Sequence, residues 1–491
     1  MQKKVIIIGS GFSGLSAACY LAKAGFDVTI YEKNKTVGGR SRQLNKSGFV
    51  FDMGPSWYWM PEVFESFFND FNHQVKDFYE LIKLNPGYRV FYDKNDSIDI
   101  SANLTEIKAL FESYEKGSAK QLELFLADAK SKYDISFNEF ITLPGKSVVE
   151  LIKLSNLKHL KHLNITQSVS KLVRAHFKHP KLIDLLEFPV LFLGAKADDI
   201  PAIYTLMNYA DFSLGTWYPK GGMYKVVEGM ETLALKLGVK IVANTTVQKI
   251  NIAQKKVTGV TINKQECLAD YVVGAADYHH VETKLLPQQF RNYTEKYWGK
   301  KVMAPSSILF YVGLNKKLPK LEHHNLIFDE DFELHCSEIY DNPKWPTKPR
   351  MYISMASKTD ATVAPQNCEA IVGLIPLAVG LEDTDEIREK YKELFLEKLA
   401  FIAQEDIKDA IEFVEIYAHN DFIKDYNAFK GNAYGLANIL KQTAFLKPKI
   451  RNKKLKNLYY CGQLTVPGPG VPPSLISGEI VANEIIKQEK L

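Results

Sequence analysis

Cysteines are few in this chain, and none of them are clustered. The five cysteines among 491 residues stand singly, without a CxxC pair or another metal-ligand spacing. The adjacent histidines at 279–280 and 323–324 point apart on any regular element, so they make poor metal sites. We therefore expect no disulfide framework and no metal, as in a reducing compartment.

Long apolar runs are also missing. The longest, around residues 191–195, is far shorter than the ~20 residues that a membrane-spanning helix needs. An apolar strand is predicted within a few residues of Met1, which leaves no room for a secretory signal peptide. We expect a cytoplasmic protein that associates at most with the surface of a membrane.

Neither charge is in strong excess. Lys and Arg number 62 against 57 Asp and Glu, a formal net charge of +5. No basic helix with interleaved stacking aromatic residues is present, so we expect no nucleic-acid partner. Aromatic residues make up 12% of the chain, which fits a large apolar ligand and equally a dense aromatic core. The length predicts two domains.

What the chain does contain is a glycine-rich unit within residues 1–40. The apolar run 5–8 predicts a buried strand, the sequence GSGFSG follows at 9–14, and residues 15–24 have a helical pattern. A second strand over 28–31 ends at Glu32. GxGxxG in this strand–turn–helix–strand context, with an acid about twenty residues further on, is typical of a dinucleotide site.

Each part of this unit has a physical role at such a site. Gly9 permits the tight turn, Gly11 lets the backbone approach a pyrophosphate, and Gly14 lets the helix lie close to the sheet. The helix N-terminus offers N–H groups and a partial positive charge to phosphates. Glu32 would accept hydrogen bonds from an adenosine ribose and repel a 2′-phosphate. A glycine-rich turn in an ordinary α/β domain is the alternative.

The type of dinucleotide is indicated outside the unit. No second GxGxxG follows an apolar strand, so we expect no separate nicotinamide domain. The sequences GGR at 38–40 and FDMGPS at 51–56 resemble flavoproteins of the glutathione-reductase type. In those proteins the Gly-Gly pair and its Arg continue the pyrophosphate cradle, and the next turn faces the flavin. The resemblance favours FAD over NAD.

Two later motifs extend the resemblance to the whole chain. With GGRSR at 38–42, FDMGPS at 51–56, WYPKGGM at 217–223 and PGPGVP at 467–472, the chain resembles the bacterial-type phytoene desaturase family of carotenoid desaturases. The first two motifs are shared with amine oxidases and protoporphyrinogen oxidases, and the last two narrow the resemblance to the carotenoid branch. Gln463 departs from the acidic or small residue that many relatives carry there.

The resemblance implies a division of the chain into discontinuous domains. We expect an α/β (α+β) protein with a Rossmann-like FAD-binding domain of the glutathione-reductase and amine-oxidase type, built from residues 1–65, 215–283 and 420–491. A partly helical substrate domain would use residues 66–214 and 284–419. Within it, residues 153–181 alternate Lys and His with apolar residues. Such a segment can lie on an anionic membrane, and an ordinary helix with a solvated lysine face explains it equally well.

Motifs and resemblance together give a set of candidate cofactor-binding residues. They are Gly9, Ser10, Gly11, Phe12, Ser13, Gly14, Glu32, Lys33, Gly39, Arg40, Gly54, Pro55, Ser56, Val247, Gly462, Gln463 and Val471. We expect structural roles for Arg42, beside phosphate, and for Asp52, capping a turn. No catalytic acid or base is indicated. Cys461 lies before Gly462 without the sequence typical of covalent flavin attachment, so we expect non-covalent FAD.

The implied activity is FAD-dependent desaturation of a C40 polyene. Desaturation of phytoene towards lycopene is our first expectation, and 3,4-desaturation of a 1-hydroxycarotenoid or desaturation of a shorter, squalene-like polyene are alternatives. More remote are an amine or protoporphyrinogen oxidase and a non-catalytic prenyl-binding escort of small GTPases. The expected partners are an apolar polyene, a membrane surface, and oxygen or a quinone as electron acceptor.

Overall fold

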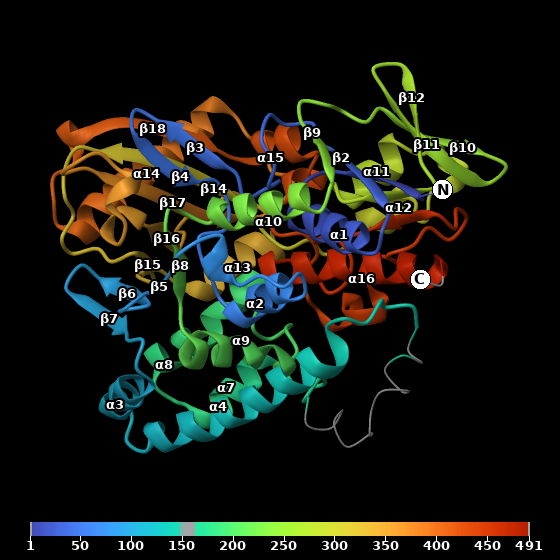
Figure 1. Ribbon diagram of the computed structural model, residues 1–491. Coiled ribbons are helices and arrows are strands. Elements are labelled where there is room, and N and C mark those ends of the chain that lie inside the picture. The colour runs from blue at the N-terminus through green and yellow to red at the C-terminus, as the bar shows by residue number, and fades with distance from the viewer. Residues whose placement is uncertain (1, 148–149, 151–162, 490–491) are drawn as a thin grey trace.

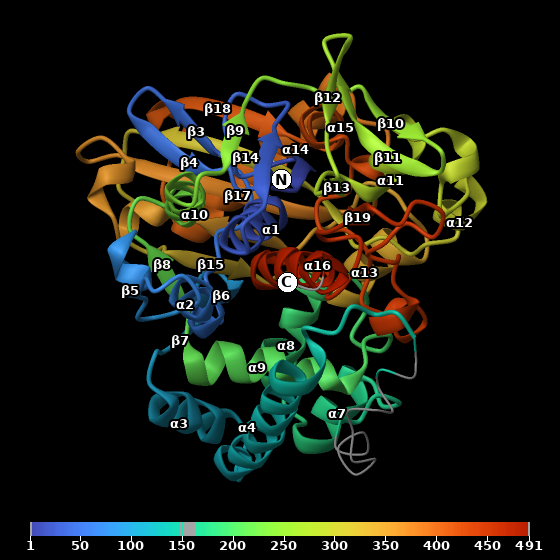
Figure 2. The same ribbon diagram turned by 45° about the vertical axis from the view of Figure 1, so that its right-hand side comes forward.

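A parallel sheet forms the part of the molecule that contains the glycine-rich unit. The computed structural model describes residues 2–147, 150 and 163–489 (Figures 1 and 2). Five parallel strands lie in the order β19-β13-β1-β2-β9. They are β1 (Lys4–Ile8), β2 (Asp27–Tyr31), β9 (Lys240–Val242), β13 (Tyr271–Gly274) and β19 (Leu458–Tyr460). The central strands β1 and β13 are almost wholly buried, as apolar strands of a parallel sheet are.

Two helices from opposite ends of the chain lie side by side on this sheet (Figures 1 and 2). They are α1 (Phe12–Lys23) and α16 (Val471–Glu489). A Cβ atom on Gly478 of α16 would lie 2.3 Å from the carbonyl oxygen of Ser13, so only glycine permits this approach. Helix α10 (Tyr224–Lys236) also contacts α1. The C-terminal helix is thereby fixed against the N-terminal glycine-rich unit.

Smaller elements surround the parallel sheet. A three-stranded antiparallel sheet consists of β10 (Lys249–Ala253), β11 (Lys256–Ile262) and β12 (Gln265–Leu268). Helices α11 (Tyr278–Lys284), α12 (Glu295–Gly299) and α15 (His419–Tyr426) follow later in the chain. The hairpin β3 (Gln43–Lys46) and β4 (Phe49–Asp52) precedes α2 (Pro61–Asn69), and β5 (Leu81–Lys83) pairs with β8 (Trp217–Pro219).

A seven-stranded mixed sheet is the second large sheet of the molecule. Its order is β18-β14-β17-β16-β15-β6-β7, and only the β15–β6 pair is parallel. The strands are β6 (Tyr88–Asp93), β7 (Asp96–Ile100), β14 (Ser306–Leu314), β15 (His324–Ile327), β16 (Met351–Ser354), β17 (Glu369–Leu377) and β18 (Ile411–Tyr417). Helix α14 (Asp385–Ala403) covers one face, where the rings of Phe395 and Phe310 stack at 4.8 Å. Helix α13 (Phe332–Tyr340) lies between β15 and β16 in the chain.

A helical lobe lies at the opposite side of the molecule from β10–β12 (Figure 1). It contains α3 (Leu104–Tyr114), α4 (Ser118–Ile135), α7 (Val169–His176), α8 (Pro180–Glu187) and α9 (Leu206–Tyr209). π-Helical turns follow α4 at Ser136–Phe140 and α9 at Ala210–Leu214. Part of the predicted basic segment 153–181 falls outside the described residues.

The α/β fold class is confirmed. The predicted strands 5–8 and 28–31 correspond to β1 and β2. The predicted helix 15–24 begins earlier, at Phe12, because the glycine turn leads directly into it. The proposed domain boundaries stay a prediction. Across the described residues, no helix combines the length and apolar content needed to cross a bilayer.

Candidate active site

One large cavity joins the glycine-rich unit to the seven-stranded sheet and the helical lobe. Its volume is about 820 Å³. All the predicted cofactor-binding residues line it except Gly14. A Cβ on Gly14 would lie 2.2 Å from the carbonyl oxygen of Gly9, so this glycine permits close packing and does not face the cavity. Gly14 is therefore removed from the set of contact residues.

The glycine loop presents open backbone to the cavity. A Cβ on Gly11 would meet only the Cα of Gly39, at 4.0 Å. Gly11 is also the N-cap of α1 and provides no side-chain cap, so the helix begins with N–H groups open to an anion. This arrangement fits a diphosphate lying across the start of α1.

Glu32 holds the loop from the end of β2. Its Oε2 accepts hydrogen bonds from the Ser10 backbone N–H at 2.9 Å and from Ser10 Oγ at 2.7 Å. Its Oε1 accepts one from the N–H of Asn34 at 2.9 Å. The carboxylate is buried and lines the cavity. Its predicted contact with a ribose stays a prediction, and the loop-fixing bonds to Ser10 are an additional role that the sequence did not indicate.

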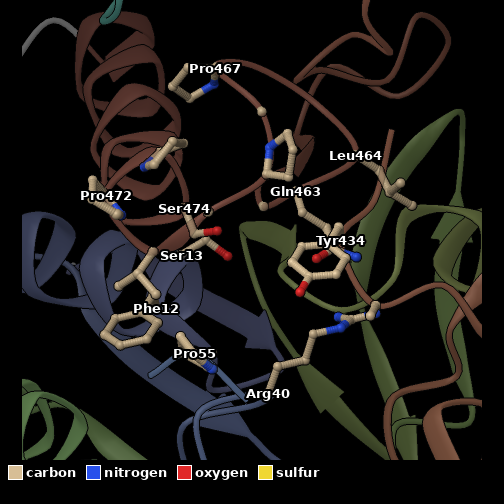
Figure 3. A pocket seen from close by; sticks show the side chains of 18 of the residues that line it. Phe12, Ser13, Arg40, Pro55, Tyr434, Gln463, Leu464, Pro467, Pro472 and Ser474 are labelled. Carbon is tan, nitrogen blue, oxygen red and sulfur yellow. The ribbon is translucent and has the colours of Figure 1, made fainter. Parts of the chain in front are cut away.

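Arg40 is the cation that the structure brings to the loop. Its Nη2 donates to the carbonyl oxygen of Asn432 at 3.2 Å, and its guanidinium lies 5.1 Å from the ring of Tyr426. Its Nε is buried and has no hydrogen-bond partner among the described residues. Figure 3 shows Arg40 next to Tyr434 in the cavity wall. A buried, unpaired donor atom on this partly exposed cation beside the open loop fits a phosphate group.

Arg42 and Asp52 have other partners. Arg42 forms an ion pair with Asp425 and does not line the cavity, so its expected place beside phosphate is wrong. Asp52 caps the start of α10 through the N–H groups of Met223, at 2.7 Å, and Tyr224, at 3.2 Å. Burial raises the pKa of Asp52 to about 7. Its capping role agrees with the expectation.

The C-terminal segment closes the cofactor end of the cavity. The backbone N–H of Gly462 donates to Ser477 Oγ of α16 at 3.0 Å. Gln463 donates from Nε2 to Asn432 Oδ1 at 3.0 Å, so Asn432 receives hydrogen bonds from both Gln463 and Arg40. Figure 3 shows Gln463 and Tyr434 close together on this side. Burial raises the pKa of the Cys461 thiol to about 12, which makes it a poor nucleophile.

The other end of the cavity is apolar and aromatic. Trp57 lies 6.3 Å from Phe188, and Phe188 lies 6.2 Å from Phe328, measured between ring centroids. All three line the cavity. This aromatic wall begins next to Ser56, in the turn predicted to face the flavin, and suits a flat, extended apolar ligand.

A hydrogen-bonded chain leads from the cavity into the protein. Ser56 Oγ lies 2.8 Å from the hydroxyl of Tyr352, which lies 2.6 Å from Nδ1 of His324. His324 stacks on Trp57 at 4.2 Å, and burial lowers its pKa well below the usual value, so the imidazole is neutral. No sequence motif indicates this chain of hydrogen bonds, because residues 56, 324 and 352 meet only in the folded protein.

The fold and the site define a class of protein. The chain belongs to the family of flavin containing amine oxidoreductases, whose model matches residues 12–486. Like the family, it is a flavin-dependent oxidoreductase. This agrees with the diphosphate-type loop, Arg40 and the C-terminal segment, which line one end of the cavity.

Individual relatives are more specific. The chain is 39% identical to a carotenoid 3,4-desaturase of Haloarcula japonica, over 98% of each chain. It is 31% identical to a 4,4′-diapophytoene desaturase (4,4′-diaponeurosporene-forming) of Staphylococcus aureus, over 99% of each chain. Among solved structures, an oxidoreductase from Methanosarcina mazei has a TM-score of 0.66 at 16% identity and covers 98% of this chain and 100% of its own. A triple mutant of putrescine oxidase has a TM-score of 0.61 at 13% identity, over 99% of each chain, so these two structures show the fold alone.

Proposed function

We propose that this protein is an FAD-dependent carotenoid desaturase that oxidises the C3–C4 bond of an acyclic, 1-hydroxylated carotenoid. The observation that carries the proposal is the single cavity that connects the glycine loop to the aromatic wall. The expectation of phytoene desaturation is not confirmed by the relatives, and 3,4-desaturation fits them better. FAD is proposed from the GxGxxG unit, Glu32 and the Gly-Gly-Arg motif together.

The reaction removes a hydride from one carbon and a proton from its neighbour. The electron pair of the second C–H bond becomes the new double bond. FAD, when bound, accepts the hydride. The protein has to hold one C–C unit of a long apolar chain in place, exclude water and take up the proton. The aromatic wall performs the first two tasks through burial, at about 25 cal/mol for each Å² of substrate removed from water.

The proton is assigned to the chain of Ser56, Tyr352 and His324. In the arrangement in which Ser56 donates to Tyr352 and Tyr352 donates to Nδ1 of His324, a proton taken up at Ser56 Oγ is relayed to Nδ1. The distances of 2.8 and 2.6 Å permit this transfer. The imidazole is neutral, so the lone pair on Nδ1 is free to take the proton. Because burial disfavours the imidazolium, the strongly acidic substrate cation left by hydride removal has to drive the transfer. The proton acceptor, Nδ1 of His324, is thus buried behind the aromatic wall of the cavity.

Membrane association is proposed from the rim of the cavity. Ile165, Leu440 and Leu446 line the cavity and yet are 37%, 47% and 42% exposed. An apolar rim around an apolar cavity supports uptake of a polyene directly from a bilayer, since the substrate would not leave lipid for water. The proposed location is the cytoplasmic membrane surface, with oxygen or a membrane quinone as the final electron acceptor.

Reconstitution tests the proposal. The protein, loaded with FAD, is incubated in liposomes with a 1-hydroxylated acyclic carotenoid and separately with phytoene, under oxygen or with a quinone. We expect one new conjugated double bond in the hydroxylated substrate, seen as a red shift and a mass loss of two hydrogens. Conversion of phytoene alone would restore our first expectation. A colourless protein that cannot be loaded with FAD would instead favour the escort.

A further inference from the structure

One cation lies at the apolar end of the cavity. Arg350, directly before β16, is buried and lines the cavity together with Phe328 and Phe332. Its guanidinium lies 4.5 Å from the Phe328 ring and 4.9 Å from the Phe332 ring. A charged group in such a place is costly unless it has a function or a complete set of partners.

Its partners fix the guanidinium but do not use all of its donors. Nε donates to the carbonyl oxygen of Glu330 at 2.7 Å, and Nη2 donates to Asp184 at 3.2 Å. The backbone N–H of Arg350 donates to Nδ1 of His335, at 3.1 Å. Nη1 has no hydrogen-bond partner in the part of the chain that the structure describes, although an arginine has five N–H donors.

Arg350 is close in the chain to Tyr352, the middle residue of the proposed proton relay. Arg350 directly precedes β16, the strand that carries Tyr352, so the Cα atoms of the two residues are at most roughly 7 Å apart, and both residues line the cavity. Tyr352 in turn contacts Ser56 in the turn predicted to face the flavin. The aromatic wall of Trp57, Phe188 and Phe328 joins the two places. A ligand group held by Arg350 therefore lies in the same cavity as Tyr352, along the same aromatic wall.

We propose that Arg350 is the specificity-determining residue that binds the hydroxyl group at one end of the polyene. This inference rests on the proposed function and names how its substrate is selected. The C3–C4 bond lies within a few atoms of a hydroxyl on C1, whereas the bonds oxidised in the middle of phytoene lie many carbons from either end. Arg350 and Tyr352 line the cavity from neighbouring positions of the chain, and this arrangement suits the first case.

The charge of the site favours a neutral oxygen over a carboxylate. Asp184 already forms an ion pair with Arg350, and its side chain is 24% exposed. The pair leaves little net charge for a second anion, while Nη1 still offers N–H groups to a hydroxyl oxygen. A hydrogen bond from a charged donor in a water-poor cavity discriminates against a ligand that lacks the oxygen.

The experiment compares Arg350, directly before β16, with Arg89 on β6 of the same seven-stranded sheet. Arg350→Met removes the proposed donor, and Arg89→Met is the matched control. Arg89 on β6 likewise donates to a carboxylate, Asp99, and to a backbone carbonyl, but it does not line the cavity. Both variants and the natural protein are loaded with FAD and placed in liposomes. The ligands are a 1-hydroxylated acyclic carotenoid, the same polyene without the hydroxyl, and the same polyene with a terminal carboxylate.

Binding is followed by quenching of tryptophan fluorescence, and turnover by kcat/KM. We expect the natural protein and Arg89→Met to prefer the hydroxylated polyene by roughly 10- to 100-fold in both measurements. In Arg350→Met the ratio between the two polyenes should fall close to one, because binding and kcat/KM decrease for the hydroxylated polyene and stay unchanged for the other. Equal losses on both polyenes would show a merely structural role and overturn the inference.

Three other outcomes are also decisive. If the natural protein binds the two neutral polyenes equally well, or prefers the carboxylate, the inference is wrong even where turnover occurs. If it turns over neither polyene, the proposed function fails, and the binding comparison still decides the role of Arg350. Retention of the hydroxyl preference in Arg350→Met would assign the selection to another residue.

Discussion

Gly11 and Gly14 lie three positions apart in the glycine-rich loop, and replacing each of them by alanine should have a different effect. At Gly11 a Cβ would meet only the Cα of Gly39 at 4.0 Å, so Gly11→Ala leaves the fold intact. The methyl group would instead occupy the open face of the loop. At Gly14 a Cβ would lie 2.2 Å from the carbonyl oxygen of Gly9, so Gly14→Ala forces α1 away from the sheet.

The size of each effect follows from the contacts involved. A methyl group on Gly11 keeps a diphosphate from the first N–H groups of α1. Loss of two hydrogen bonds to a charged group, at about 1.5–3 kcal/mol each, raises the Kd for FAD by roughly 10²- to 10⁴-fold. Overpacking at Gly14 costs about 1–3 kcal/mol of folding free energy. Gly299→Ala, at a position with nothing within 4 Å and outside the cavity, is the control.

The assay separates binding from folding. FAD affinity is measured by titration of flavin fluorescence, and folding by the thermal midpoint of the protein without cofactor. We expect Gly11→Ala to lose affinity at an unchanged midpoint, Gly14→Ala to lose thermal stability, and Gly299→Ala to change neither. A Gly11→Ala protein that binds FAD as tightly as the natural protein would refute the assignment of this loop to the diphosphate.

Three further predictions concern single groups. Tyr352→Phe interrupts the proton relay, so kcat should fall about 10²-fold or more while polyene binding is retained; an unchanged kcat would remove Tyr352 from the mechanism. Burial raises the pKa of Asp211, which accepts a hydrogen bond from Tyr88 at 2.7 Å, to about 8. Because the folded protein then holds a proton that the unfolded chain releases near pH 4, stability should fall by up to about 4 kcal/mol between pH 5 and pH 8, and Asp211→Asn should abolish that part of the change. Thermal midpoints at both pH values test this, and parallel curves for the two proteins would contradict it. Acid precipitation should release the flavin into the supernatant, since Cys461 is a buried thiol; flavin retained in the pellet would mean a covalent bond.

The cofactor end of the site was accessible to sequence reasoning because its residues act through the backbone. A glycine directly before a helix start, in a strand–turn–helix context, predicts a phosphate-binding loop whatever the rest of the chain is. The Gly14 exception is instructive, since its role is packing and a motif does not distinguish packing from contact. The misplacement of Arg42 has a similar cause: two arginines stand two positions apart, and only the ion pair with Asp425 decides which of them leaves the cavity.

The residues at the substrate end of the cavity could not be predicted from the sequence in this way. Tyr352 and His324 are 28 positions apart and meet because β15 and β16 are hydrogen-bonded neighbours, whereas Ser56 comes from 296 positions before Tyr352. Arg350 belongs to no sequence motif. Its proposed role follows from its contacts with two phenylalanine rings, Glu330 and Asp184. The chemistry of side chains that contact one another only in the folded protein can be predicted only once their spatial arrangement is known.

The sequence by itself thus determined a dinucleotide-binding unit, an α/β fold and the resemblance to flavin-dependent desaturases. Local spacing is enough for these, since turns, helix starts and alternating burial are short-range properties of the chain. Only the tertiary structure decided that the glycine loop and an aromatic wall share one cavity, and that Arg350 lies at its apolar end. Those features arise from contacts between distant segments, whose pairing depends on the packing of the whole molecule.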